Sequence, residues 1–472
     1  MGKPHILAPA TGDPVRVLID RARAAQAEYE RWTQERVDEA VAAAGWAIVK
    51  PENNRRLAER AVADTGLGNV PDKIAKNERK TMGLLRDLQG LRTVGVVAQY
   101  PELGITEIAR PVGVVAALTP STNPGATPAN KIINALKCRN AVILAPSPKG
   151  FSTGALLLEL MHAELAKVGA PKDLVQILPE PITKEATQAL MRQADLVVAT
   201  GSQANVRAAY SSGKPAFGVG LGNVAVIVDA SADVDDAARK ICESKCFDNA
   251  TSCSSENSLV IVEAVWDSML AALARAGGAL LAHAEKGRLH CAMWPDGRLS
   301  SAVMARPVGD IVRAAGLRAE LSRAKFLMLE DSGAGNDHPF SGEKLSLVLT
   351  LYRVKDFDAA FEQVRSIYAY QGAGHSVGIH TNDETHVMRL GLEMPAARVI
   401  VNQAHAIANG GAFDNGLPFS LSMGCGTWGG NSISENLHWK HYLNITRIVR
   451  TIAPRMPTID GIFGAYHRKF GA

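Results

Sequence analysis

The alternation of apolar runs with helical patterns over residues 112–201 is the feature that most constrains the fold. Runs typical of buried strands occupy residues 112–120, 140–147, 173–179 and 195–201, and helical patterns separate them. Strands that alternate with helices predict an α/β fold with a parallel, doubly wound sheet. Because crossovers in such sheets are right-handed, we expect ligands at the carboxyl ends of these strands.

Segments before and after residues 112–201 also show helix and strand patterns. Apolar residues recur at helical spacing over residues 14–30 and 34–49, which predicts two amphipathic helices. Two strand-like runs separated by a Pro/Gly turn predict a hairpin over residues 92–112. A second region of alternating strands and helices begins at residues 223–229, and residues 438–450 alternate as a final strand. At 472 residues, we expect two or three domains.

Composition excludes several classes of function. Charged residues make up 21% and hydrophobic residues 47% of the chain, the balance of a soluble globular protein. The net charge of +4 is spread without a basic run, so we expect no nucleic-acid partner. No apolar stretch approaches the ~18 residues of a membrane span, and the N-terminus lacks a signal-peptide pattern. We therefore expect a cytoplasmic protein with no membrane segment.

The six cysteines favour reduced thiols over disulfides or metal binding. None forms a C-x-x-C pair. Cys242 and Cys246 lie four residues apart, but no nearby histidine completes a zinc site, so no metal is expected. Reduced thiols are typical of a cytosolic protein.

Cys253 is the candidate nucleophile. It follows the small polar residues of FDNATS, so little bulk shields its sulfur. An accessible thiolate attacks electrophiles readily. The alternative is a buried cysteine that packs as a small hydrophobic residue, and the local sequence leaves both open.

Polar residues at predicted strand ends form a second group of candidates. Asn123 in TPSTNPG offers an amide donor suited to an oxyanion, or a turn before proline. Thr200, Gly201 and Ser202 join a strand to a helix, where they could hold a pyrophosphate, or Ser202 could cap the helix. The glycines of residues 217–223 precede a strand and do not fit a dinucleotide-binding fingerprint.

Two further residues lie in segments of ambiguous role. Glu343 precedes a predicted strand and could accept ribose hydroxyls, or it could be a solvated surface residue. His375 lies in the Gly-rich segment QGAGHS, where a general acid/base and a hydrogen-bonded structural histidine are both open. Cys425 in a glycine-dense segment is expected to pack.

Taken together, these segments resemble the aldehyde dehydrogenase superfamily, and more closely its CoA-acylating branch. The motifs that carry the resemblance are TPSTNP, ATGS, AAYSSGKPAFGVGLGN, FDNATSC, EKLS, GAGHS and GCGTWGGNS. The resemblance implies that Cys253 is the nucleophile and Asn123 the oxyanion donor. It implies dinucleotide contacts from Thr200, Gly201, Ser202 and Glu343.

The resemblance also implies a domain plan. A Rossmann-type cofactor domain would comprise residues 1–95 and 113–222, and an α/β catalytic domain residues 223–435. A small β oligomerisation element would combine residues 96–112 and 436–472. A homodimer or homotetramer is then expected.

One departure from the superfamily concerns the fate of the acyl group. Hydrolytic members carry a general-base glutamate in an E-L-G-G-K motif, and Val219 stands at that place here. Valine cannot activate water, so a thioester on Cys253 is expected to be transferred to coenzyme A. His375 could assist the CoA thiol.

The substrate is indicated by two segments. Residues 52–88 and 410–430 are similar to acylating sulfoacetaldehyde dehydrogenases, which implies sulfoacetaldehyde, CoA and NADP. A sulfonate needs fixed donors, and Asn409 and Gly410 could form an anion-binding turn near His405, or a plain loop. Two other readings remain open: an NAD-dependent acylating enzyme for acetaldehyde, propionaldehyde or succinate semialdehyde, and a non-catalytic scaffold of the same fold.

The choice of dinucleotide rests on residues 140–150. Pro146 and Ser147 end the predicted strand and are expected to contact the cofactor. NAD-preferring relatives often carry a glutamate where Pro148 stands here, and Lys149 follows. Lacking that carboxylate, the chain is expected to accept NADP, and NAD stays open because Lys149 could be a surface lysine.

Overall fold

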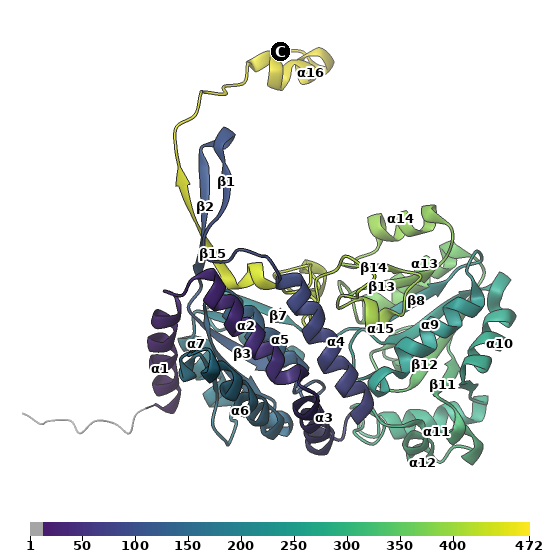
Figure 1. The fold of residues 1–472 in the computed structure, drawn as a ribbon. Coiled ribbons are helices and arrows are strands. Elements are labelled where there is room, and N and C mark those ends of the chain that lie inside the picture. The colour runs from purple at the N-terminus through teal and green to yellow at the C-terminus, as the bar shows by residue number, and fades with distance from the viewer. Residues whose placement is uncertain (1–12) are drawn as a thin grey trace, which may run out of the picture.

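The computed structural model describes residues 13–472, which form three sheets (Figure 1). The first sheet is five-stranded and entirely parallel, in the order β5-β4-β3-β6-β7. Its strands are β3 (Val114–Thr119), β4 (Ala141–Pro146), β5 (Val175–Ile177), β6 (Leu196–Thr200) and β7 (Ala216–Val219). The strand order changes direction between β3 and β6, and ligands bind at such switch points in doubly wound sheets.

Helices enclose this sheet on both faces, which confirms the predicted α/β fold. They are α1 (Pro14–Tyr29), α2 (Gln34–Val49), α3 (Pro51–Thr65), α4 (Val70–Leu88), α5 (Ala126–Lys137), α6 (Phe151–Lys167), α7 (Lys184–Gln193) and α8 (Gln203–Tyr210). Local signals start them: the side chains of Asp13 and Thr33 cap α1 and α2. Every residue of β3, β4 and α5 is buried, so this unit has its own core.

One strand of this sheet was not predicted. Residues 217–223 were interpreted as a glycine-rich segment ahead of a strand, but Ala216–Val219 is itself β7, hydrogen-bonded to β6. Glycine alternation hid a four-residue strand because glycine has low strand propensity.

The second sheet is seven-stranded and parallel, in the order β10-β11-β12-β9-β8-β13-β14. Its strands are β8 (Val224–Val228), β9 (Glu256–Val262), β10 (Gly278–Leu280), β11 (Phe326–Glu330), β12 (Val348–Val354), β13 (Val377–His380) and β14 (Val399–Val401). Its helices are α9 (Val234–Cys246), α10 (Trp266–Ala276), α11 (His283–Met293), α12 (Val308–Ala315), α13 (Phe357–Tyr370), α14 (Glu384–Glu393) and α15 (His405–Ala408). Two separate apolar clusters pack on its faces.

The third sheet forms an arm that projects from the body (Figure 1). It pairs the predicted hairpin, β1 (Gly95–Tyr100) and β2 (Ile105–Pro111), with β15 (Leu443–Val449), all antiparallel. Beyond β15 the chain leads to α16 (Ile459–Phe470), which lies away from the body.

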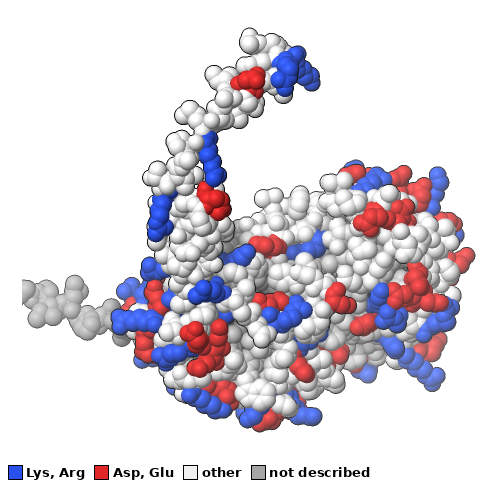
Figure 2. All heavy atoms as spheres, turned by 45° about the horizontal axis from the view of Figure 1, so that its top comes forward, with Lys and Arg blue, Asp and Glu red and all other residues white. Residues whose placement is uncertain are grey.

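Acidic and basic side chains are interspersed over the body, whereas the arm is largely white apart from separate basic and acidic groups and a basic cluster at its end (Figure 2). Over residues 13–472, no helix combines the length and the apolar character that crossing a bilayer requires.

Candidate active site

A cavity of about 370 Å³ lies where the two large sheets meet. From the five-stranded sheet it receives the carboxyl ends of β3, β4 and β6 with the loops that follow them. From the seven-stranded sheet it receives the segments that precede β8, β9 and β12. The cavity therefore lies at the carboxyl ends of strands in the first sheet, as expected for a ligand site. The second sheet borders it with the amino ends of its strands.

Most of the candidate residues meet in this cavity. The lining residues that the sequence singled out are Asn123, Ser147, Thr200, Gly201, Ser202, Cys253 and Glu343. Segments more than 200 residues apart in the chain thus bring a thiol, an amide and a carboxylate into one space.

The loop that carries Cys253 has an unusual backbone. Helix α9 ends at Cys246, and Asp248, Asn249 and Ala250 then adopt positive φ angles of 51°, 52° and 60°. Such angles are strained for residues with a side chain and persist only where surrounding contacts hold them. Here the Asp248 carboxylate accepts the Asn69 N–H at 3.0 Å, while the Asp72 carboxylate accepts the Asp248 N–H at 2.7 Å. The strained turn directs the chain toward the cavity.

Gly222 sits directly against the nucleophile loop. A Cβ atom at this position would overlap the carbonyl oxygen of Cys253 and lie 3.0 Å from its Cβ. Only glycine lets the segment before β8 approach Cys253 this closely.

Burial and charge both oppose ionisation of the nucleophile. Burial, with a further contribution from Glu343, raises the pKa of the Cys253 thiol to about 12. Burial likewise raises the pKa of Glu343 to about 8, although its Oε1 accepts the Gly222 N–H at 3.2 Å. Near neutral pH both groups are therefore protonated in the ligand-free protein.

The amide of Asn123 is oriented by a buried lysine. Lys76 Nζ donates to Asn123 Oδ1 at 2.8 Å, to Asp248 Oδ2 at 2.5 Å and to Thr251 Oγ1 at 3.0 Å. With its oxygen engaged by Lys76, the Asn123 amide has its N–H donors free for the cavity. An amide N–H is the group that stabilises a developing oxyanion.

Asp248 is the carboxylate partner of two lysines of α4. Lys73 Nζ lies 3.1 Å from the same Asp248 Oδ2 and also donates to the carbonyl oxygen of Thr122 at 3.2 Å. Burial pushes the pKa of Asp248 upward, but Lys76 and Lys73 outweigh it and hold that pKa below the ordinary value. The carboxylate therefore stays charged and ties the nucleophile loop to α4.

The strand-to-helix junction after β6 fits the phosphates of a dinucleotide. Ser202 is the N-cap of α8 and its Oγ accepts the Asn205 N–H at 3.3 Å, so the helix-cap interpretation is confirmed. Gly201 has a φ of 153°, and Thr200 Oγ1 lies 2.6 Å from Ser422 Oγ. The first turn of α8 still directs backbone N–H groups toward the cavity, which favours an anion.

A second cavity of about 400 Å³ adjoins the first. Both are lined by Thr119, Ser147 and Asn205, and Pro146 and Pro148 line the second alone. Two contiguous cavities on either side of a helix N-terminus have the extent and polarity that an elongated dinucleotide requires. Lys149 lines neither cavity.

Three candidate residues lie behind the nucleophile loop and line neither cavity. His405 Nδ1 donates to the carbonyl oxygen of Ser254 at 2.9 Å, and Asn409 Nδ2 donates to Ser254 Oγ at 2.9 Å. The carbonyl oxygen of Gly410 accepts from Lys80 Nζ at 2.6 Å. These contacts buttress the residue that follows Cys253.

His375 is also buried outside the cavity. Its Nδ1 lies 2.8 Å from Ser376 Oγ, and its Nε2 has no hydrogen-bond partner among the described residues. Burial, aided by Arg398, holds the pKa of His375 well below its ordinary value, so the ring is neutral. Arg398, which the sequence did not single out, donates to the carbonyl oxygens of His375 and Gly424.

The position of the missing general base is occupied by apolar residues. Val219 is buried at the end of β7, and Gly220 and Leu221 follow it into the cavity lining. Among the described residues that line the cavity, Glu343 is the one carboxylate.

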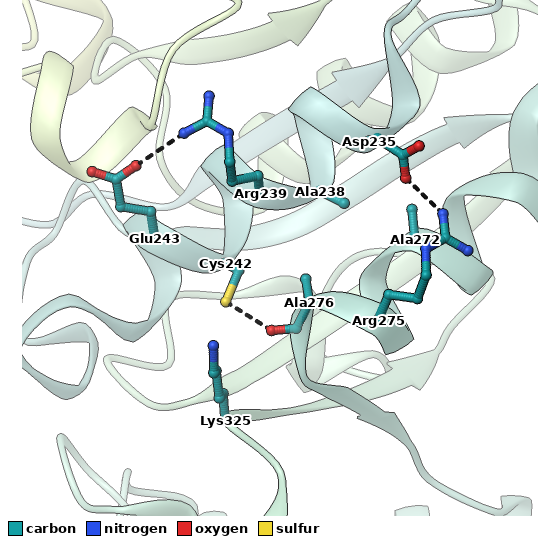
Figure 3. Close-up of a pocket in the computed structure, with 9 residues that line it drawn as sticks. All are labelled: Asp235, Ala238, Arg239, Cys242, Glu243, Ala272, Arg275, Ala276 and Lys325. Carbon is teal, nitrogen blue, oxygen red and sulfur yellow. Dashed lines mark hydrogen bonds and ion pairs between the residues drawn. The ribbon is translucent and has the colours of Figure 1, made fainter.

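A separate surface cavity of about 450 Å³ contains none of the motif residues (Figure 3). Cys242 Sγ lies at its floor and donates to the carbonyl oxygen of Ala276 at 3.2 Å. An ion pair joins Arg275 and Asp235 at 2.6 Å across its rim. No histidine is among the described residues that line it.

Comparisons with known proteins agree with this geometry. Residues 7–284 match the aldehyde dehydrogenase family. The chain is 63% identical to an acylating sulfoacetaldehyde dehydrogenase of Cupriavidus necator, over 98% of this chain and 94% of the relative. It is 38% identical to an acetylating succinate-semialdehyde dehydrogenase of Clostridium kluyveri, over 95% and 99%.

A solved structure shows the same architecture. An acetylating aldehyde dehydrogenase from Geobacillus thermoglucosidasius superposes with a TM-score of 0.90 at 36% identity, covering 94% of this chain and 97% of that one. The fold, the thiol–amide pair in the cavity and these relatives together show that the chain belongs to the acylating branch of the aldehyde dehydrogenase family.

Proposed function

We propose that this enzyme oxidises sulfoacetaldehyde to sulfoacetyl-CoA, with hydride transfer to NADP. The observation that carries the acylating reaction is the shared cavity of Cys253 and Asn123, whose one lining carboxylate is Glu343. The similarity to acylating sulfoacetaldehyde dehydrogenases supports the choice of aldehyde.

The residues of the cavity divide the chemistry between them. The Cys253 thiolate attacks the aldehyde carbon, and the Asn123 amide N–H and the Cys253 backbone N–H stabilise the alkoxide. The nicotinamide ring, when bound, accepts the hydride. The thioester left on Cys253 has no lining carboxylate at the Val219 position to activate water, so a CoA thiol takes the acyl group.

The cavity offers the sulfonate hydrogen-bond donors but no cationic side chain from the described residues. No Lys, Arg or His is among its described lining residues, but Ser121, Thr122, Thr127 and Ser252 are. We propose that these hydroxyls and neighbouring backbone N–H groups hold the sulfonate. The turn at Asn409 and Gly410, with His405, is a weaker site because its polar groups are engaged behind Ser254.

An aldehyde panel tests the substrate. Sulfoacetaldehyde, acetaldehyde, propionaldehyde and succinate semialdehyde are each assayed for reduction of NADP and NAD, with and without CoA. Sulfoacetaldehyde should give the highest kcat/KM, and turnover should require CoA. A higher kcat/KM for acetaldehyde would make acetaldehyde the preferred substrate and would leave the proposed acylating reaction unchanged.

Cysteine variants test the nucleophile and the scaffold alternative. Cys253→Ala should abolish turnover and the acyl-enzyme seen by intact-protein mass spectrometry. Cys425→Ala is the matched control, because Cys425 is buried nearby but does not line the cavity. An unmodified wild-type protein after incubation with aldehyde and NADP would favour the non-catalytic scaffold.

The preference for NADP rests on the end of β4. Pro148 lines the second cavity, where a glutamate would repel a 2′-phosphate. Pro148→Glu should lower the NADP/NAD ratio of kcat/KM by roughly tenfold, which is the effect of about 1.4 kcal/mol. Lys149→Ala should change that ratio less, since Lys149 lines neither cavity; equal effects would assign the preference to Lys149.

His375 is proposed to assist the CoA thiol. Its Nε2 is buried with no hydrogen-bond partner among the described residues, although burial and Arg398 hold the pKa of the ring well below its ordinary value and make it a weak base. His375→Gln should slow acyl transfer to CoA while leaving the single-turnover burst of NADPH unchanged. A reduced burst would instead place His375 in the first half-reaction or in the folding of the site.

We further propose that the arm assembles a homodimer or homotetramer. Six large apolar side chains are exposed on or beside α16: Met456, Ile459, Ile462, Phe463, Tyr466 and Phe470. Such a surface needs a partner. A chain ending at residue 453 should sediment as a smaller species than the full chain. Identical sedimentation would show that residues 454–472 are not needed for assembly.

A further inference from the structure

Two histidines and a glutamate converge near the base of the arm, outside the catalytic cavity. Glu435, His438 and His441 place one donor atom each within 4.8 Å of one another. His438 Nε2 lies 3.5 Å from Glu435 Oε2, and His441 Nε2 lies 3.2 Å from Glu435 Oε1. Both rings therefore present the same nitrogen to one carboxylate.

The backbone sets the orientation of both rings. His438 is the N-cap of the 3-10 turn Trp439–Tyr442, and residues three apart in such a turn lie on one face. His441 Nδ1 lies 3.0 Å from the carbonyl oxygen of His438, to which its Nδ1–H tautomer donates, and His438 Nδ1 lies 3.5 Å from the backbone nitrogen of Lys440. In the Nδ1–H tautomer His441 Nε2 has a lone pair for a metal ion, and the bond to the carbonyl is the second contact typical of metal-binding histidines. His438 offers Nε2 in the same tautomer when it gives up its long contact with Lys440.

The ring geometry fits a tetrahedral ion. The His438 and His441 centroids are 4.6 Å apart and their planes meet at 80°. Zn–N bonds of about 2.0–2.1 Å in a tetrahedral arrangement place two imidazole centroids roughly 5 Å apart.

The surrounding segment is anchored while the third ligand stays reachable. The side chains of His438 and His441 are 14% and 8% exposed, whereas that of Glu435 is 61% exposed. The carbonyl oxygen of Glu435 accepts the Gly424 N–H at 3.0 Å, and Asn436 donates to the carbonyl oxygen of Pro418 at 2.9 Å. An ion can enter from solvent without opening the fold.

We propose that Glu435, His438 and His441 form a binding site for Zn²⁺. Two imidazoles and one carboxylate are a ligand set that zinc adopts with water in the fourth position. On binding, each ring carries its one proton on Nδ1, so zinc replaces the two contacts between Nε2 and the Glu435 carboxylate with three coordinate bonds. The ion joins the segment after the catalytic loops to the turn that leads into β15.

Zinc titration against a fluorescent chelator tests the site in the full chain. The wild type should bind Zn²⁺, and its zinc X-ray absorption spectrum should show nitrogen and oxygen ligands. Glu435→Gln, which changes an exposed side chain and leaves folding intact, should weaken binding by roughly tenfold or more. His438→Ala with His441→Ala should remove it, and zinc should raise the Tm of the wild type but not of this double variant.

His386→Ala is the matched control, because His386 also contacts two carboxylates, Asp229 and Asp383, but has no second histidine. This variant should keep wild-type affinity. Unchanged zinc affinity in both Glu435→Gln and the double histidine variant would overturn the proposal. Sulfur in the first coordination shell would also overturn it and would assign the zinc to cysteines. Because binding is measured without aldehyde, this result is independent of the proposed activity.

Discussion

Nζ of Lys76 lies 2.8 Å from Oδ1 of Asn123, and this contact decides which end of the amide faces the nucleophile. An asparagine amide can rotate by half a turn and exchange its donor for its acceptor. A buried ammonium on one side removes that freedom, since an N–H₂ group turned toward it would meet a second set of donors. Lys76 is therefore a positioning residue for the oxyanion site.

Replacement of Lys76 by methionine should lower kcat far more than it raises KM. Loss of an oxyanion donor costs about 10²–10³ in kcat, and loss of its orientation should approach the lower end of that range. Stopped-flow measurement of the first turnover, with saturating aldehyde, reports this step directly.

Lys73→Met is the matched control for this prediction. Lys73 shares the Asp248 carboxylate with Lys76 but donates to the Thr122 carbonyl instead of to Asn123. Both variants lose an ion pair to Asp248, so a comparable loss of kcat in the two would assign the effect to the nucleophile loop and not to the amide.

Glu343→Gln should make Cys253 more reactive toward iodoacetamide at alkaline pH in the ligand-free enzyme. Burial raises the pKa of Glu343 to about 8, and its charge above that pH helps raise the pKa of Cys253. As the pH rises through 8, the wild-type carboxylate ionises and opposes the thiolate, whereas glutamine does not.

The rate ratio of variant to wild type should therefore grow from near one at pH 6.5 to several-fold at pH 9, measured by peptide mapping. Cys291, which is exposed, provides an internal reference for the reagent. A ratio that stays constant across this range would show that Glu343 does not influence the thiol.

Gly222→Ala should destabilise the protein and abolish turnover, because the new methyl group overlaps the Cys253 carbonyl. Overpacking of this kind typically costs about 1–3 kcal/mol. Gly287→Ala, at an exposed helix position with open space around it, should instead raise the free energy of unfolding by up to about 1 kcal/mol. Urea denaturation compares the two, and equal stability of Gly222→Ala with the wild type would contradict the close approach.

Local patterns in the sequence predicted most strands of the first sheet, whereas the roles of the cavity residues came from the family resemblance. Apolar runs between helical segments predicted β3, β4, β5 and β6, and the third-sheet pairing of the hairpin with β15 followed the family resemblance. Polar residues are easiest to recognise in a sequence next to the ends of helices and strands. Cys253, Asn123 and Ser202 lie at such positions.

What the sequence missed depends on contacts between distant segments. Lys76 reads as one of several charged residues on an amphipathic helix, and only the burial of α4 against residues 248–251 reveals its role. The cluster of Glu435, His438 and His441 was missed for another reason. Its residues are close in the sequence, at spacings of three, but only the fold shows that both rings turn toward one carboxylate.

The sequence also suggested a site that the structure does not support, at His405, Asn409 and Gly410. A turn rich in small polar residues looks like an anion site when its neighbours are unknown. In the folded chain its donors serve Ser254, and the carbonyl of Gly410 is occupied by Lys80. Sequence identifies polar groups but not which of them are already satisfied.

The proposed assembly through the arm would make the stability of this protein depend on its concentration. The last helix carries an apolar face that none of the described residues of the body covers, while β15 completes a sheet that begins at residue 95. In the proposed assembly, dilution would uncover that face and concentration would cover it, so the melting temperature would rise with the amount of enzyme in solution.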